Sequence, residues 1–167
     1  MTQTAPENLT IDFSVDDERW TDQHIAIIKS AITAGFSSQC ANVREEIELS
    51  VLLTNDAAQQ ELNKQWRNID KPTNVLSFPQ IEPFKDPMGM IGDISLAIET
   101  LQTEAESQHI NLDDHLKHLA LHGFLHILGY DHLSDQEAIE MESLETKILA
   151  TLGVENPYSG DRHANDV

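Results

Sequence analysis

Apolar residues follow two different spacings along this chain, and each spacing predicts one kind of secondary structure. Alternating apolar and polar positions are typical of half-buried strands, whereas apolar positions three or four residues apart indicate helices. Strands are expected at residues 9–15, 47–53, 74–78 and 91–98. Helices are expected at residues 21–35, 56–66, 99–108, 111–128 and 135–152. This order predicts an α+β (mixed α/β) fold, with a mixed sheet of about four strands covered by about five helices.

Residues at the expected helix ends have the chemistry of caps. Thr21 precedes a helical stretch, where its side chain can accept a backbone N–H. Ser134 and Glu137 have the spacing of a capping box at the start of the last helix. Gly35 and Gly129 fit the position just beyond a helix C-terminus, because glycine adopts positive φ without strain. The first helix is therefore expected to end at Gly35.

The length and composition predict one soluble domain. A chain of 167 residues that is 40% apolar can build one core, and its polar ends, 1–8 and 156–167, are expected to be loose. The lone Cys40 excludes an intramolecular disulfide. The first residues have no signal-peptide pattern, and no apolar run approaches the roughly 20 residues that span a bilayer. We therefore expect a cytoplasmic location and no membrane partner.

The charge balance limits the kind of partner. The chain has 29 acidic and 10 basic residues, a formal net charge of −19. Nonspecific nucleic-acid binders gain affinity from Lys and Arg on phosphates, so DNA is not expected as a partner and any RNA site must be small. The expected last helix is especially acidic, which predicts a solvated face or a surface for a basic partner. Its acidic residues are Asp135, Glu137, Glu140, Glu142 and Glu145.

Three of the ten basic residues, Lys64, Arg67 and Lys71, lie within eight positions. This cluster is the best candidate for a local anion site, because the planar guanidinium of Arg67 can bind two phosphate oxygens at once. The alternative is a solvated helix end, where the helix dipole favours cations. The spacing leaves both interpretations open.

Histidines provide the strongest chemical signal. Six of the eight lie between residues 109 and 132. His122 and His126 are four residues apart and share a helix face, and a turn at Gly129 can bring His132 back to the same point. Three imidazoles with an open fourth position are typical of a catalytic zinc ion, although they also suit nickel, copper and iron. We expect one metal ion, Zn²⁺, per chain.

The same segment can be compared with the metzincin zinc motif, H-E-x-x-H-x-x-G-x-x-H. Residues 122–132 are HGFLHILGYDH, so the three histidines and the glycine are in register and predict a metzincin-like zinc site. Gly123 replaces the protease's general-base glutamate, and Met141, inside an expected helix, is a poor Met-turn. A metalloprotease is therefore a less favoured alternative.

Two further residues are candidates for supporting the metal ligands from outside. His118 lies one turn before His122, but eight helical residues, about 12 Å, separate it from His126. It therefore cannot share an ion with His126. Asp131 could orient a histidine by accepting its other N–H, or could stabilise the turn through its own backbone. Both interpretations of Asp131 stay open.

The sequence resembles the bacterial YbeY-type endoribonucleases from about Ile11 to Tyr158. The family motif H-G-x-L-H-L-x-G-Y-D-H is similar to residues 122–132, with Ile127 for the usual leucine. Family blocks also resemble LNKQWR at 62–67, PTNVLSFP at 72–79 and GDI at 92–94. In the first block, Trp66 replaces the usual tyrosine. In the second block, Asn74 replaces the usual aspartate, and because this change removes a charge we assign position 74 no catalytic role.

This resemblance implies a zinc-dependent endoribonuclease that cleaves single-stranded RNA in ribosomal RNA maturation and ribosome quality control. It implies that His122, His126 and His132 hold the zinc, and that Arg67 acts on the substrate phosphate in catalysis. Lys64 and Lys71 are candidate RNA contacts. Trp66 could stack on an unpaired base, but we expect it instead to anchor the helix end in the core.

A different class of function is a zinc-stabilised ribosome assembly factor with little intrinsic activity. Such a factor would dock on small-subunit ribosomal or assembly proteins through the acidic surface. The net charge favours docking to basic proteins, and the two functions are compatible with each other.

Overall fold

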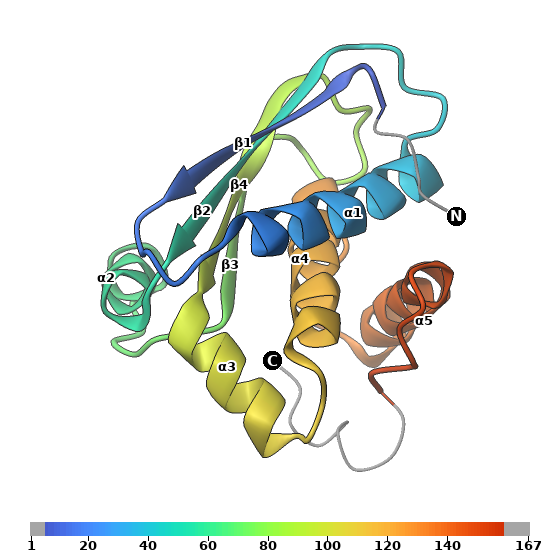
Figure 1. Ribbon diagram of the computed structural model, residues 1–167. Helices are drawn as coiled ribbons and strands as arrows, with labels where there is room; N and C mark the ends of the chain where they lie inside the picture. Colours follow the sequence, from blue (N-terminus) through green and yellow to red (C-terminus); the bar gives the residue numbers. More distant parts are fainter. Residues whose placement is uncertain (1–5, 159–167) are drawn as a thin grey trace.

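The computed structural model describes residues 6–158, which contain four strands and five helices (Figure 1). In chain order these are β1 (Leu9–Val15), α1 (Asp22–Gln39), β2 (Ile47–Thr54), α2 (Asp56–Arg67), β3 (Val75–Pro79), β4 (Gly89–Ala97), α3 (Ile98–Ser107), α4 (Leu112–Leu128) and α5 (Asp135–Thr151). The strand order is β1-β2-β4-β3; the β1–β2 and β2–β4 pairs are parallel, and β3 is antiparallel to β4. The predicted α+β class with a four-stranded mixed sheet is confirmed.

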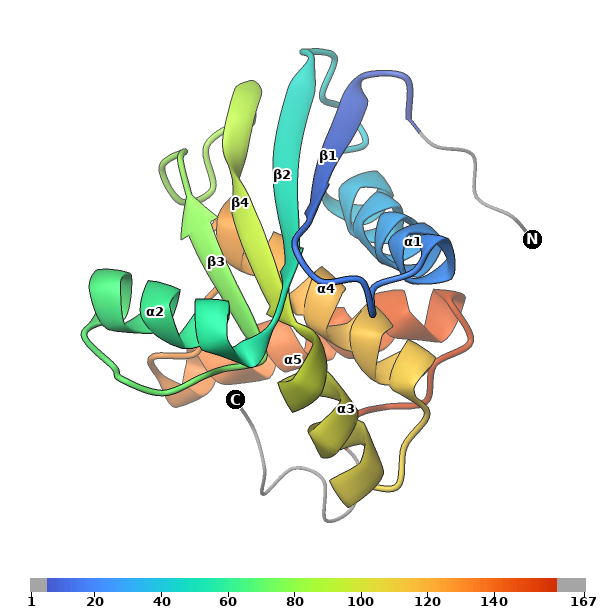
Figure 2. The same cartoon turned by 60° about the vertical axis from the view of Figure 1, so that its left-hand side comes forward.

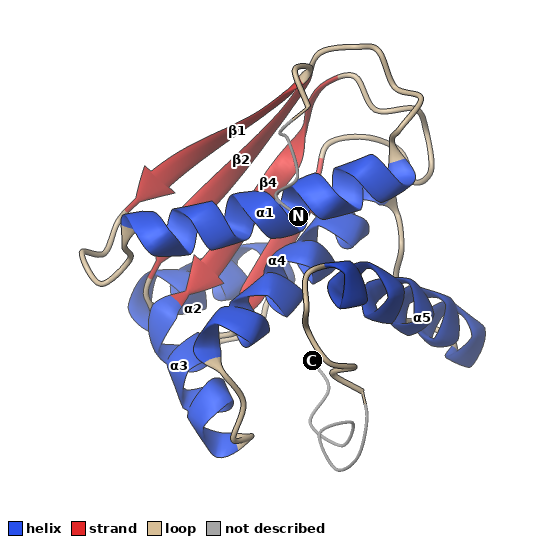
Figure 3. Ribbon diagram, turned by 45° about the vertical axis from the view of Figure 1, so that its right-hand side comes forward, coloured by secondary structure: helices blue, strands red, loops and turns tan. Residues whose placement is uncertain are grey.

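The helices lie in layers around the sheet. Helices α1 and α4 cover one face, and α5 lies beyond α4, further from the strands (Figure 3). Helix α2 lies on the other side of the strands from α1 (Figure 2). Its buried Gln59 donates a hydrogen bond to the carbonyl of Ser95 in β4. None of the helices in residues 6–158 is long and apolar enough to cross a membrane.

Helix α4 is the central element of the core. Leu119, Leu121, Phe124 and Ile127 are all fully or almost fully buried, so α4 is apolar on most of its circumference. A helix with this pattern must be surrounded by other elements, and α4 packs against α1, α3, α5 and the sheet. The histidines of α4 are therefore held in a rigid, densely packed environment.

The expected end of the first helix at Gly35 is wrong. Helix α1 continues to Gln39 and is capped at Cys40. Gly35 lies where α1 crosses α4, and a Cβ added there would be 2.8 Å from Phe124 Cδ2 and 2.9 Å from Leu121 Cδ1. Glycine is present because two helices approach closely, and not because the helix stops.

We expect Gly35→Ala to destabilise the protein. Glycine to alanine in a helix interior is normally favourable by about 1 kcal/mol. Here the added methyl overpacks the contact with two buried side chains, which costs about 1–3 kcal/mol. Urea unfolding should show a net loss, while Ser38→Ala, an exposed change in the same helix, should change stability by less than about 0.5 kcal/mol. A more stable Gly35→Ala protein would show that the crossing has spare room.

The two ends of the described chain are attached to the rest of the structure. The Asn8 side chain donates hydrogen bonds to the carbonyls of Val43 and Glu45. The Tyr158 hydroxyl donates to Glu145 in α5. Both residues fall within the ends that the sequence suggests are loose, and the other parts of that expectation, 1–5 and 159–167, lie outside the described residues.

Candidate metal centre

Three histidines converge at the C-terminal end of α4. His122 and His126 are one helical turn apart, and their Nε2 atoms are 3.0 Å from each other. Gly129 adopts φ +120° and turns the chain back, and a side chain there would meet the backbone of Pro83 at 2.8 Å. The turn brings His132 to the pair, so that one ring nitrogen of each histidine lies within 4.8 Å of the others. The structure thus brings together the three residues that the sequence nominates as ligands.

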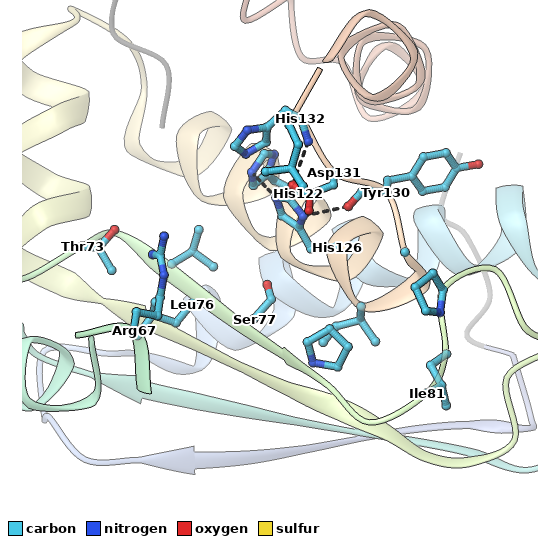
Figure 4. Close-up of a pocket in the computed structure, with 16 residues that line it drawn as sticks. Arg67, Thr73, Leu76, Ser77, Ile81, His122, His126, Tyr130, Asp131 and His132 are labelled. Carbon is cyan, nitrogen blue, oxygen red and sulfur yellow. Dashed lines mark hydrogen bonds between the residues drawn. The ribbon is translucent and has the colours of Figure 1, made fainter. Parts of the chain in front are cut away.

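Hydrogen bonds on the far side of two rings fix which nitrogen faces the centre. His122 Nδ1 lies 3.0 Å from Glu145 Oε1. His126 Nδ1 lies 2.8 Å from the carbonyl oxygen of Tyr130 (Figure 4). Both partners accept, so each Nδ1 carries the hydrogen and each Nε2 presents a lone pair. Two lone pairs only 3.0 Å apart are stabilised by a shared cation. This donor set fits a transition-metal ion bound by neutral imidazoles.

The protonation state of His126 suits this role. Burial lowers the pKa of His126 most, and together with the neighbouring His122 and His132 it brings that pKa down to about 4. A neutral ring at pH 7 keeps its lone pair available, because a metal ion binds only the deprotonated imidazole.

Glu145 corrects the expectation that the acidic residues of the last helix form a solvated face. Asp135, Glu137 and Glu140 are exposed, but Glu145 is fully buried against α4. Burial by itself raises the pKa of Glu145, but the hydrogen bonds from His118 and His122 together outweigh it and hold the pKa well below its usual range.

A signal for this burial exists in the sequence, although our sequence analysis missed it. Met141, Glu145, Ile148 and Leu149 are buried and share one helical face of α5. Glu145 is therefore a carboxylate placed within an apolar stripe. Such a residue needs a partner inside the fold, because an unpaired buried charge is costly.

A cavity of about 490 Å³ opens beside the three histidines. Its lining includes β3, the 81–83 loop and Arg67 at the end of α2. Arg67 lies across the cavity from the histidines (Figure 4). Its side chain is exposed, and within residues 6–158 its guanidinium has no hydrogen-bond or ion-pair partner.

The family model for endoribonuclease YbeY matches residues 10–153. This chain belongs to the endoribonuclease YbeY family. The endoribonuclease YbeY of Bradyrhizobium sp. strain BTAi1 is 50% identical over 154 residues, which cover 88% of this chain and 90% of the relative. That of Rhizobium etli is 42% identical over 161 residues, which cover 91% and 94%. The sequence resemblance to this family is thereby confirmed.

A solved structure of another protein supports the fold of this chain. The solution structure of TM1509 from Thermotoga maritima matches with a TM-score of 0.60, covering 84% of this chain and 87% of that one. At 24% identity, this likeness bears on the fold alone.

The YbeY family chain has no room for the metzincin general base. A Cβ at Gly123 would lie 3.2 Å from Ile94 Cγ2 and 3.3 Å from both Ser77 Oγ and Val75 Cγ2. Ser77 also donates its hydroxyl to the Gly123 carbonyl. Position 123 therefore packs directly on the sheet, and a glutamate there could not reach the metal centre without separating α4 from β3 and β4.

The other predicted contacts are distributed around the cavity. Lys64 and Arg67 both lie in the last turn of α2, as the helix-end interpretation suggests, but only Arg67 lines the cavity. Lys71 is exposed outside it. Trp66 is 64% exposed, with its ring 6.2 Å from that of Phe78, so the expectation that it anchors the core is wrong.

Trp66 lines a second cavity, of about 430 Å³, together with residues of β2 and β4. It is therefore placed away from the three histidines. Any contact that it makes with a substrate would lie outside the cavity that holds Arg67.

The two residues proposed to support the ligands differ in their contacts. His118 Nε2 lies 2.6 Å from Glu145 Oε2, and burial lowers the pKa of His118 against the opposing effect of that carboxylate. Asp131 Oδ1 accepts the backbone N–H of His132 at 2.8 Å, which is the contact of a turn-stabilising aspartate.

Proposed function

We propose that this protein is a zinc-dependent endoribonuclease that cleaves single-stranded RNA, with one Zn²⁺ per chain. The relatives described above carry the name endoribonuclease. The observation that carries the proposal for this chain is that three convergent histidines face an unpaired arginine across one cavity.

Each residue of the cavity has a part in this chemistry. His122, His126 and His132 would hold the ion through ring nitrogens, with the first two kept in the correct tautomer by Glu145 and Tyr130. When bound, zinc supplies a Lewis acid and activates water for hydrolysis of a phosphodiester.

Arg67 would bind the scissile phosphate. Its guanidinium can donate two parallel hydrogen bonds to non-bridging oxygens, and its charge stabilises the extra negative charge of the transition state. Among the residues that line the cavity, all within the described part of the chain, Arg67 is the one lysine or arginine. A single cation in a strongly acidic protein gives the small, local anion site that the net charge requires.

The shape of the cavity supports a single-stranded substrate. Its lining comes from α4 and the turn that follows it, from β3 and from the end of α2. We infer that an unpaired segment of RNA enters it with one base splayed out. Sequence-selective proteins commonly read RNA in this unpaired form.

We further infer that the substrate is ribosomal RNA in the cytoplasm, and that basic ribosomal or assembly proteins help to deliver it. The exposed carboxylates of α5 would provide the docking surface for small-subunit proteins. Charge complementarity accelerates such an encounter and makes it sensitive to salt.

The proposal can be tested with chelator-stripped protein that is reloaded with zinc. We expect about one zinc ion per chain, and cleavage of a labelled single-stranded RNA that disappears on stripping and returns on reloading. The same RNA in a duplex, single-stranded DNA and casein serve as substrate controls and should remain intact. Stoichiometric zinc without metal-dependent RNA cleavage would overturn the nuclease and leave a docking factor. Cleaved casein would favour a protease.

A further inference from the structure

Behind the metal centre, a buried carboxylate joins two histidines of α4 to the C-terminal segment. Glu145 is fully buried, and each of its carboxylate oxygens has at least one hydrogen-bond partner. Oε1 lies 3.0 Å from His122 Nδ1, and Oε2 lies 2.6 Å from His118 Nε2. Oε2 also accepts the hydroxyl of Tyr158 at 2.7 Å.

The sequence spacing explains why one carboxylate can serve both rings. His118 and His122 are one helical turn apart on α4, so their side chains point the same way toward α5. Helix α5 places Glu145 opposite the gap between them, and the two oxygens then meet one ring each. Tyr158 closes this group from outside, with its ring edge-on to His118 at 5.4 Å between centroids.

We propose that Glu145 is a positioning residue for the metal centre, which it acts on through His122 with Tyr158 and His118 as supports. This inference rests on the proposed function, since it requires that His122 binds a metal ion. A carboxylate that accepts the outer N–H of a ligand histidine fixes the ring orientation and makes the inner nitrogen more basic. His118, which shares the carboxylate, and Tyr158 restrict Glu145 to one conformation.

Two other roles for this group can be considered. The ring nitrogens and carboxylate of His118, His122 and Glu145 are close enough for a metal ion of their own. However, the carboxylate of Glu145 accepts hydrogen bonds from His118 Nε2 at 2.6 Å and from His122 Nδ1 at 3.0 Å. These two ring nitrogens therefore carry hydrogen and offer no lone pair to an ion. The other alternative is a purely structural tie between α4 and α5, and it must be separated by experiment.

The structure provides a matched control for that experiment. Glu104 of α3 makes an analogous contact, with its Oε1 2.9 Å from Nε2 of the buried His115 of α4. His115 is not among the three converging histidines. Glu104→Gln therefore changes a similar helix-to-helix carboxylate without touching a ligand.

The test compares zinc affinity, by competition with a chromophoric chelator, in the full-length wild type, Glu145→Gln and Glu104→Gln. We expect Glu145→Gln to bind zinc roughly 10–100-fold more weakly. Glu104→Gln should bind zinc as the wild type does, even where its unfolding midpoint falls. The absorption spectrum of bound Co²⁺ should change in Glu145→Gln only, because it reports the geometry of the ligands.

If Glu145→Gln does not fold, the variant Tyr158→Phe tests the same inference. It removes one hydrogen bond to the carboxylate at the outer side, and we expect a smaller but measurable loss of zinc affinity with native circular dichroism.

Three results would contradict or separate the proposals. Wild-type zinc affinity and an unchanged Co²⁺ spectrum in folded Glu145→Gln would overturn the positioning role and leave a structural tie. A wild type that binds no metal would overturn both this inference and the proposed metal centre. A wild type that binds zinc but cleaves no RNA would overturn the nuclease alone, and the affinity comparison would still decide the role of Glu145.

Discussion

Replacing His126 with alanine is expected to remove bound metal and RNA cleavage together. His126 is the central histidine of the cluster, with its Nε2 3.0 Å from that of His122 and its Nδ1 2.8 Å from the Tyr130 carbonyl oxygen. Without it, two histidines remain, too few for a catalytic zinc site. We expect less than about a tenth of the wild-type zinc content after dialysis and cleavage slower by more than about 100-fold.

The control for this experiment is another histidine. His109 is exposed and adopts φ +54°, a region that asparagine tolerates well. His109→Asn should therefore keep wild-type zinc and activity. If His126→Ala retained stoichiometric zinc in elemental analysis, the metal would be bound elsewhere and the three-histidine centre would be wrong.

The second large effect is expected for Arg67→Ala, which should lose catalysis but keep its metal. Arg67 lines the cavity opposite the three histidines and forms no hydrogen bond with any of them. Losing a preorganised charge in the transition state costs about 10²–10³-fold in rate. Single-turnover cleavage of a short single-stranded RNA, with zinc content measured on the same sample, separates this effect from loss of metal.

Two further variants make this result specific. Arg67→Lys keeps the charge but loses the planar fork, so it should recover part of the rate. Lys64→Ala changes another cation in the same helical turn that does not line the cavity, and it should have a small effect. Arg67→Ala with the wild-type rate would remove Arg67 from the catalytic residues.

The helix ends show how far local patterns extend. The predicted N-caps hold, since Thr21 accepts from the His24 backbone and Ser134 accepts from the Glu137 backbone. The predicted capping box at Ser134 is only half formed, because the Glu137 side chain does not bond back to the Ser134 backbone. These are interactions between neighbours in the chain, so the sequence contains both partners. The prediction that the helix ends at Gly35 is wrong because the role of this glycine depends on Phe124 and Leu121, which are far away in the sequence. A glycine at a helix end and a glycine at a helix crossing look alike until the packing is known.

Trp66 and Glu145 illustrate the same limit in opposite directions. An aromatic residue near a helix end suggested the core, yet it is exposed beside Phe78. A glutamate in an acidic helix suggested solvent, yet it is fully buried between two histidines. Hydrophobicity gives the average location of a residue type, whereas its actual location depends on which side chains the fold places opposite it.

The sequence by itself determined the order of strands and helices and the convergence of the three histidines, because both follow from short spacings. Helical periodicity puts His122 and His126 on one face, and Gly129 allows the turn that returns His132. Only the tertiary structure decided that Arg67 faces them and that Glu145 supports His122 from behind. Those residues come from α2 and α5, and packing around α4, which no local spacing encodes, brings them to one place.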